Sequence, residues 1–153
     1  MLVDQCRRAL AAAKLPGSAL ELEITESVFL HPGEVPSQLL TALKNEGVRI
    51  AIDDFGTGFS SLAYLLNLSF DTLKIDRTFV SDIDNDPAKE GIMKGILTIA
   101  NSLGVTCVAE GIESSSQLHC LQRLGCSHYQ GYYFQAATAM DQLLPLIDKK
   151  FRV

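Results

Sequence analysis

Apolar residues recur with two different periods along the chain, and segments of the two kinds alternate. Spacings of three or four residues indicate helices, which we expect over residues 2–13, 36–46, 88–103, 117–124 and 139–149, with a short Leu-rich helix that ends at Asn67. Alternation at every second position indicates strands, which we expect over residues 19–25, 48–53, 70–76, 105–110 and 127–132. Strands that alternate with helices predict an α/β fold with a parallel sheet and right-handed crossovers.

Glycines mark the predicted ends of three helices. Gly47, Gly104 and Gly125 each follow the last periodic residue, where helices commonly end in a left-handed cap. A strand is expected after each of them, so the unit of helix, glycine and strand occurs three times. The stripes expected to face the core hold Ile92, Ile96, Ile99 and Leu103 in the longest helix, and Leu118, Leu121 and Leu124 in the next one.

The two faces of the predicted strands differ in polarity. In strand 48–53, Val48, Ile50 and Ile52 share an aliphatic face, whereas Asp53 lies on the other face. An open sheet covered by helices on both sides would be apolar on both faces. A polar second face instead predicts a barrel, whose interior can hold polar groups near its mouth. The polar residues at or near the ends of the five strands, which we expect to converge there, are Glu23, Asp53, Lys74, Glu110 and Gln130.

Each of these polar residues also has an ordinary structural explanation. Glu23 could be solvated at a sheet edge, and the Lys74 ammonium could extend to solvent. Glu110 and Glu113 could favour the N-terminus of the following helix through its dipole. Gln130 could belong to a turn. Matching positions on five consecutive strands favour a shared site over these separate explanations.

The run Ala51–Ser61 carries the strongest chemical signal. Asp53 and Asp54 end an apolar strand, and Gly56 and Gly58 allow the chain to turn directly afterwards. A carboxylate pair at a strand end suits one or two divalent cations. The alternative is a strand followed by a polar turn, in which Asp and Gly are common.

Composition limits the classes of function. The chain has 153 residues, of which 47% are hydrophobic and 20% charged, so we expect one domain over residues 1–153. A net charge of −5 argues against a broad interface with DNA or RNA. No apolar run reaches the length of a membrane span, and no signal peptide opens the chain. The four cysteines indicate buried free thiols and a cytoplasmic protein.

Several motifs in register resemble those of the EAL-domain family, bacterial phosphodiesterases that hydrolyse cyclic di-GMP to linear pGpG. The resemblance covers about residues 2–134. It rests on Glu23-Ile24-Thr25-Glu26-Ser27, Asp53-Asp54-Phe55-Gly56-Thr57-Gly58, Leu73-Lys74-Ile75-Asp76, Ala109-Glu110-Gly111-Ile112-Glu113 and Gln130-Gly131-Tyr132-Tyr133-Phe134. It implies a partial TIM-like (β/α) barrel with about five C-terminal βα units.

The resemblance also implies a two-metal site. Glu23 and Asp53 are similar to metal ligands of the family, with Asp53 bridging two Mg²⁺ or Mn²⁺ ions, and Asp54 is similar to a ligand of the second ion. Oxygen ligands suit these hard cations. Two such cations can neutralise the charge of a phosphodiester and generate a nucleophile from water.

Further roles follow from the same resemblance. Lys74 is similar to the lysine that holds the attacking water, Glu110 to the carboxylate that assists it, and Gln130 to a glutamine that supports the water network. Glu26 is similar to the glutamate that anchors the loop of residues 55–61, and Glu113 is expected in contact with the substrate or behind the metal ligands.

The sequence also departs from the family pattern. By resemblance the chain begins before the fourth of eight strands, so a truncated domain would lack the glutamate of the family's name and an asparagine ligand. Gln135-Ala136-Ala137 replaces a proline-containing loop. Open sheet edges favour a homodimer or association with a missing N-terminal portion. The alternative functions are a noncatalytic module that binds nucleotide or a protein partner, and an unrelated barrel fragment with structural carboxylates.

Overall fold

The computed structural model describes residues 2–26, 37–58, 65–66 and 68–143. Its helices are α1 (Leu2–Ala13), the 3-10 turn η1 (Gly17–Ala19), α2 (Ser37–Asn45), α4 (Arg77–Val80), α5 (Pro87–Leu103), α6 (Ser115–Arg123) and α7 (Met140–Leu143). Its strands are β1 (Glu21–Thr25), β2 (Arg49–Phe55), β3 (Thr72–Ile75), β4 (Thr106–Ala109) and β5 (His128–Tyr129). The predicted Leu-rich helix that ends at Asn67 and the part of helix 139–149 beyond Leu143 lie largely or wholly outside the described residues.

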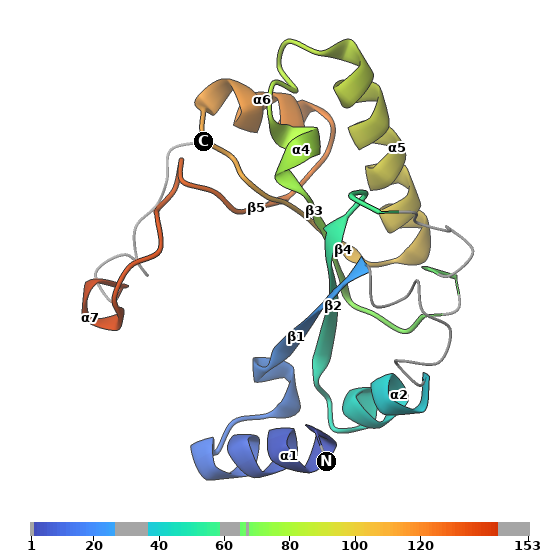
Figure 1. The fold of residues 1–153 in the computed structure, drawn as a ribbon, viewed down its shortest axis with the longest axis vertical. Coiled ribbons are helices and arrows are strands. Elements are labelled where there is room, and N and C mark those ends of the chain that lie inside the picture. Colours follow the sequence, from blue (N-terminus) through green and yellow to red (C-terminus); the bar gives the residue numbers. More distant parts are fainter. Residues whose placement is uncertain (1, 27–36, 59–64, 67, 144–153) are drawn as a thin grey trace.

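The five described strands form one parallel sheet in the order β1-β2-β3-β4-β5. Every crossover therefore moves the chain one strand further in the same direction, without the reversal of order that characterises a doubly wound sheet. Figure 1 shows a curved sheet with α2, α5 and α6 around its outer side. This is the architecture of a partial TIM-like (β/α) barrel, as the polarity of the strand faces predicted.

Most predicted helices and strands are present, but they begin or end at other residues than predicted. The prediction of the buried face of α5 was partly wrong. The predicted core stripe placed Ile92 inside, but Ile92 is 48% exposed. The buried residues of α5 are Met93, Ile96, Leu97 and Ala100. α5 is rich in apolar residues on more than one side, so the neighbours that it packs against, rather than its isoleucines alone, select the buried face. Gly104 has the expected left-handed conformation, with φ +70°.

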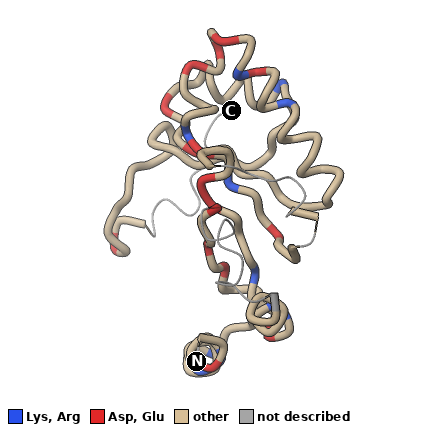
Figure 2. The backbone as a smooth tube through the Cα atoms, turned by 45° about the vertical axis from the view of Figure 1, so that its right-hand side comes forward, with Lys and Arg blue, Asp and Glu red and all other residues tan. Residues whose placement is uncertain are grey.

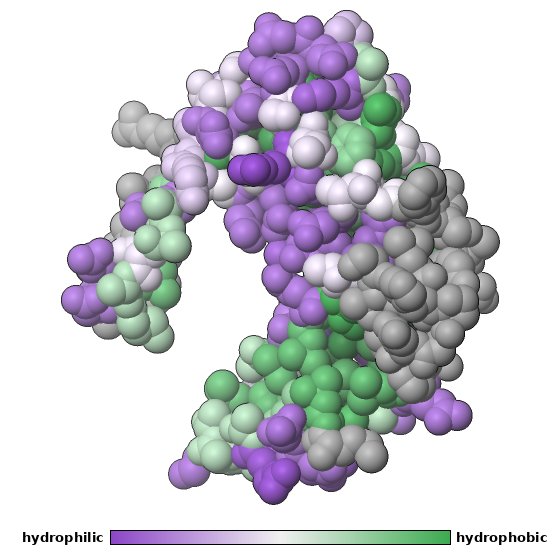
Figure 3. Space-filling view, viewed as in Figure 1, coloured by the Kyte–Doolittle hydropathy of each residue, from purple (hydrophilic) through white to green (hydrophobic). Residues whose placement is uncertain are grey.

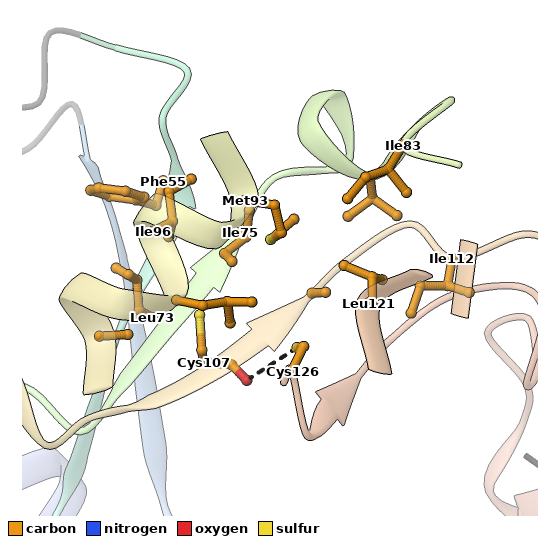
Figure 4. Packing of buried hydrophobic residues seen from close by; sticks show 14 of the residues in the cluster. Phe55, Leu73, Ile75, Ile83, Met93, Ile96, Cys107, Ile112, Leu121 and Cys126 are labelled. Carbon is orange, nitrogen blue, oxygen red and sulfur yellow. Dashed lines mark hydrogen bonds between the residues drawn. The ribbon is translucent and has the colours of Figure 1, made fainter. Parts of the chain in front are cut away.

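The main core lies between the outer face of the sheet and helices α5 and α6. Figure 4 shows Leu73 and Ile75 of β3 facing Met93 and Ile96 of α5, with Leu121 of α6 nearby. All four cysteines are buried free thiols, as predicted. This apolar layer fixes the backbone of β2–β5 from one side and leaves the opposite face of the strands for polar side chains.

A second, smaller core joins α1 and α2 to β2. It buries Val48 and Ile50, but Leu20, Leu22 and Ile24 on the β1 side are only partly buried. Figure 3 shows an apolar area over this lower part of the molecule, whereas hydrophilic residues cover its centre. None of the described helices is both long and apolar enough to cross a membrane.

Candidate active site

The Lys74 ammonium is the centre of a charged cluster on the inner face of the sheet. Its Nζ lies 2.6 Å from Glu23 Oε1, 2.8 Å from Glu110 Oε1 and 3.3 Å from Asp53 Oδ1. The four residues come from β1, β2, β3 and the position after β4, so the structure brings together four of the five residues predicted from the strand ends. Figure 2 shows acidic and basic stretches meeting near the middle of the molecule, in accordance with these distances.

The strand register explains this convergence. Thr25 pairs with Asp53 and Lys74 pairs with Val108, so the carboxyl ends of the strands lie at one edge of the sheet. Side chains two residues apart point to the same face of a strand. Glu23 and Lys74 therefore share the inner face with Asp53, and Glu110 follows Val108 on that face.

Burial and neighbouring charges shift the pKa of two of these groups, Lys74 and Glu110. Burial lowers the pKa of Lys74, but hydrogen bonds to Glu110 and Glu23 and the charges of Glu110 and Asp53 outweigh it, so the net shift is upward. Burial raises the pKa of Glu110, and the nearby ammonium of Lys74 offsets this only in part. At neutral pH Lys74 is therefore a firm hydrogen-bond donor, whereas Glu110 takes up a proton more readily than an exposed glutamate does.

Asp53 and Asp54 diverge because the strand bends between them. We expected the strand to end at Asp53, but β2 continues to Phe55 through a register shift between Ile52 and Phe55. Asp54 has φ +53°, and Asp tolerates this left-handed conformation better than most residues do. As a result Asp53 faces Lys74, whereas Asp54 lines a neighbouring cavity.

Glu26 is buried beside the start of the loop after β2. Its Oε2 accepts a hydrogen bond of 2.8 Å from the backbone N–H of Gly56. A Cβ atom built on Gly58 would lie 3.0 Å from Glu26 Oε1, so this glycine gives the carboxylate its space. The expected loop spans residues 55–61, of which 59–61 lie outside the described residues.

A cavity of about 710 Å³ opens beside the charged cluster. Glu110, Gln130 and Glu113 line it together with Asp54, although Gln130 and Glu113 are exposed and, in the described part of the chain, are not among the ion-pair partners of Lys74. The backbone N–H of Glu113 also donates to the side chain of Gln117 at the start of α6. Figure 3 shows the molecule hollowed on the left, between the segment that leads to α7 and the body.

Sequence reasoning assigned no role to Asp76, Arg77 and Tyr132, which also line the cavity. Asp76 caps α4 by accepting a hydrogen bond from the backbone N–H of Thr78, and Tyr132 is 75% exposed. The positions of Asp76 and Arg77 in the sequence could have indicated a functional role, because both residues follow the C-terminal end of β3, which is the functional end of a barrel strand.

The donor chemistry of the cluster suits a hard divalent cation. Asp53 Oδ1 and Glu110 Oε1 are buried, and both face the Lys74 ammonium, at 3.3 Å and 2.8 Å. Such buried carboxylate oxygens are the ligands that Mg²⁺ and Mn²⁺ prefer. Within the described residues, however, no three Asp, Glu, His or Cys side chains surround one ion position. Water or further protein ligands would have to complete the coordination.

The family model described as EAL domain matches residues 1–137. A cyclic di-GMP phosphodiesterase of Pseudomonas aeruginosa, NbdA, is 44% identical over 142 residues, which are 93% of this chain and 18% of that protein. The solved structure of the PaMucR phosphodiesterase in complex with c-di-GMP has a TM-score of 0.86 and 40% identity, covering 93% of this chain and 57% of that one. A manganese and cyclic di-GMP complex of Klebsiella pneumoniae BlrP1 has a TM-score of 0.78 and 34% identity, covering 87% of this chain and 33% of that one.

These comparisons agree with the fold. The chain belongs to the EAL-domain family. It spans about a fifth of the length of the curated relatives that it matches, 18% of one and 21% of another.

Proposed function

We propose that the chain carries part of the site of a metal-dependent phosphodiesterase that hydrolyses cyclic di-GMP to linear pGpG. The observation that carries this proposal is the Lys74 ammonium, which is held beside a large cavity by carboxylates from β1, from β2 and from the position after β4. Relatives named as cyclic di-GMP phosphodiesterases support the substrate, and a relative bound to manganese supports the choice of cation.

Three carboxylates would hold the cations: Glu23, Asp53 and Asp54. Bound Mg²⁺ or Mn²⁺ would neutralise the nonbridging phosphate oxygens and lower the pKa of the attacking water. Asp53 and Asp54 point to two sides of the same strand end, so they can serve neighbouring ion positions. Gln130 and Glu113, which line the cavity, are assigned to the water network and to the substrate side.

Lys74 and Glu110 divide the handling of the water between them. The raised pKa of Lys74 keeps its ammonium protonated, so it orients the water oxygen by donating a hydrogen bond and does not act as a base. Glu110, whose pKa burial raises, accepts the water proton. The water oxygen forms the new P–O bond, the bond to the 3′-oxygen breaks, and that oxygen takes a proton from solvent.

Glu26 is assigned to positioning rather than to chemistry. It holds Gly56 through a buried carboxylate, two residues after Asp54. A fixed Gly56 limits the positions of Asp54 and of the turn that follows it. Loss of this hydrogen bond would therefore act on the metal ligands through the backbone.

The test compares the wild type with Asp53→Asn in cyclic di-GMP hydrolysis with Mg²⁺ and then Mn²⁺, following pGpG by chromatography. Asp84→Asn, an exposed aspartate outside the cavity, is the matched control. The proposal predicts pGpG from the wild type and the control, and a loss of at least 100-fold in Asp53→Asn. Equal activity of all three proteins would contradict the assigned site.

A noncatalytic nucleotide-binding module is the second candidate function. It is favoured by the lack of three suitable side chains around one ion position within the described residues. Binding of cyclic di-GMP in equilibrium dialysis, without pGpG formation at high protein concentration in either metal, would select it over the enzyme.

We also propose that residues 1–153 belong to one such domain, which associates with a second copy or with an N-terminal portion. Support comes from β1, which pairs on one side only among the described strands and leaves Leu22 and Ile24 partly exposed. The buried free thiols support a cytoplasmic setting. Light scattering that finds a monomer at all concentrations would contradict self-association of this chain.

A further inference from the structure

Arg77 is the one basic residue that lines the cavity in the described part of the chain. The other charged residues of the wall are carboxylates: Asp54, Asp76, Glu110 and Glu113. An anionic ligand that enters this cavity therefore meets one guanidinium among four acidic groups. Arg77 is therefore the residue of this wall whose charge attracts an anionic ligand.

The stem of Arg77 is held in a defined position. Arg77 opens α4, and its carbonyl accepts a hydrogen bond of 2.8 Å from the backbone N–H of Ser81. Across the cavity wall, Gly111 has φ +74°, and a Cβ atom built there would lie 2.4 Å from Arg77 Cβ. The bare glycine thus lets the backbone after β4 pack directly against the base of the arginine side chain.

The head of Arg77, by contrast, has no partner among the described residues. Among the other described arginines, Arg7, Arg49 and Arg123 each form an ion pair with a glutamate, and Arg8 donates a hydrogen bond to the carbonyl of Asp4. For Arg77 the structure shows neither an ion pair nor a hydrogen bond from the guanidinium within the described ranges. Arg77 lines the cavity, and its charge contributes to lowering the pKa of the neighbouring Asp76. A fixed stem with an unengaged guanidinium is suited to receive a ligand.

We propose that Arg77 binds the phosphate group of the cyclic dinucleotide that is not cleaved. This inference rests on the proposed function. A cyclic dinucleotide carries two phosphodiesters, and the cluster of Glu23, Asp53 and Lys74 serves the one that reacts. The second phosphate would meet the acidic wall unless a cation is placed there, and a guanidinium binds phosphate oxygens in a bidentate manner.

The contact is made alike in the ground state and in the transition state, because the second phosphate does not change during the reaction. Removing it therefore raises KM and leaves kcat nearly unchanged. A lysine retains the charge but not the bidentate geometry, so Arg77→Lys recovers part of the affinity. These two properties distinguish a binding contact from a role in the chemistry or in the fold.

The experiment measures KM and kcat for the wild type, Arg77→Gln and Arg77→Lys. It also measures cyclic di-GMP binding with Ca²⁺, the ion present in another cyclic di-GMP complex of Klebsiella pneumoniae BlrP1. Arg123→Gln, which removes an exposed guanidinium on α6 outside the cavity, is the matched control. Thermal unfolding of each variant reports whether the fold is intact. The proposal predicts a rise of about tenfold or more in KM and Kd for Arg77→Gln, a smaller rise for Arg77→Lys, and kcat within about threefold of the wild type.

An analogue with 7-deazaguanine bases separates phosphate from base recognition, because arginine can also bind O6 and N7 of guanine. The proposal predicts that the loss in Arg77→Gln is the same for the analogue and for cyclic di-GMP. A wild type that discriminates against the analogue, with discrimination lost in Arg77→Gln, would overturn it in favour of base recognition. If KM and Kd of Arg77→Gln equal those of Arg123→Gln, the proposal for Arg77 is wrong but the proposed function stands. If the wild type neither binds nor hydrolyses cyclic di-GMP, the proposed function is wrong as well.

Discussion

The carboxylate of Glu23 and the ammonium of Lys74 meet at 2.6 Å although β2 lies between the strands that carry them. Two residues earlier on the same strands, Thr72 Oγ1 donates to Glu21 Oε2 at 2.8 Å. The residue of β2 beside both Glu23 and Thr72 is Ala51, which is fully buried. Its small side chain leaves room for the polar groups of β1 and β3 to meet above it.

Replacing Ala51 with leucine should separate β1 from β3 on the inner face. We expect Ala51→Leu to lower the free energy of unfolding by about 1–3 kcal/mol, because overpacking a filled position forces strain on its neighbours. It should also reduce turnover of cyclic di-GMP, since Glu23 could no longer reach Lys74. Denaturant unfolding and the hydrolysis assay would measure both effects, with the exposed Ala12→Leu of α1 as control. Unchanged stability and activity would contradict this explanation of the Glu23–Lys74 contact.

Asp71 should make the free energy of unfolding decrease as the pH falls into the acid range. Its side chain accepts hydrogen bonds from Lys44 Nζ (2.5 Å) and from the backbone N–H of Ile50 (2.8 Å). Burial raises the pKa of Asp71, but these hydrogen bonds outweigh it and bring the pKa below the ordinary 3.8. A lowered pKa in the folded state adds stability above pH 3.8 that is lost as the pH falls through the folded pKa.

Asp71→Asn should therefore cost about 1–3 kcal/mol at pH 7 and progressively less below pH 4. Thermal unfolding of both proteins from pH 7 to pH 3 measures the difference, with Asp84→Asn as a matched surface control. A difference that stays constant over this range would show that the charge of Asp71 does not contribute.

Two glycines should respond to alanine in opposite directions. Gly56 has φ +95°, and a Cβ atom there would lie 2.4 Å from the ring of Phe79, so Gly56→Ala combines strain with a clash. We expect it to destabilise the fold by about 1–3 kcal/mol. Gly95, inside α5, has open space around it, and Gly95→Ala should stabilise the helix by about 0.5–1 kcal/mol. Melting temperatures that move in the same direction for both variants would contradict the local geometry.

Cys107 should resist alkylation. Burial, with the nearby Cys126 thiol, raises its pKa to about 12. The thiolate is the reactive form, and at pH 7–8 almost none of it is present. Iodoacetamide labelling followed by mass spectrometry should find Cys107 unmodified in the folded protein and modified after denaturation. Rapid labelling of native Cys107 at pH 7.5 would indicate an exposed or activated thiol.

The polar face of the sheet could be predicted because it depends on two simple rules. Side chains alternate along a strand, and parallel strands end at one edge, so Glu23, Asp53, Lys74 and Glu110 had to lie near each other once their strands were paired in register. Gln130 belongs to the same edge but lies on the cavity wall rather than at Lys74.

Features set by packing between elements could not be predicted in this way. The bend at Asp54 depends on a register shift that the alternation of residues does not reveal. The buried face of α5 depends on its neighbours, so Ile92 was misplaced. Arg77 carries no sequence pattern of its own, and its relevance appears only when Gly111 is seen to pack against it.

The most direct test of the account is pGpG formation by the wild type and by Lys74→Gln in the presence of Mn²⁺. Lys89→Gln, whose ammonium donates to Ser81 outside the cavity, is the matched control. The account predicts pGpG from the wild type and the control, and a loss of at least about 100-fold in Lys74→Gln. Lys74→Gln that retains wild-type turnover would contradict the central claim that the carboxylates around Lys74 form the reactive centre.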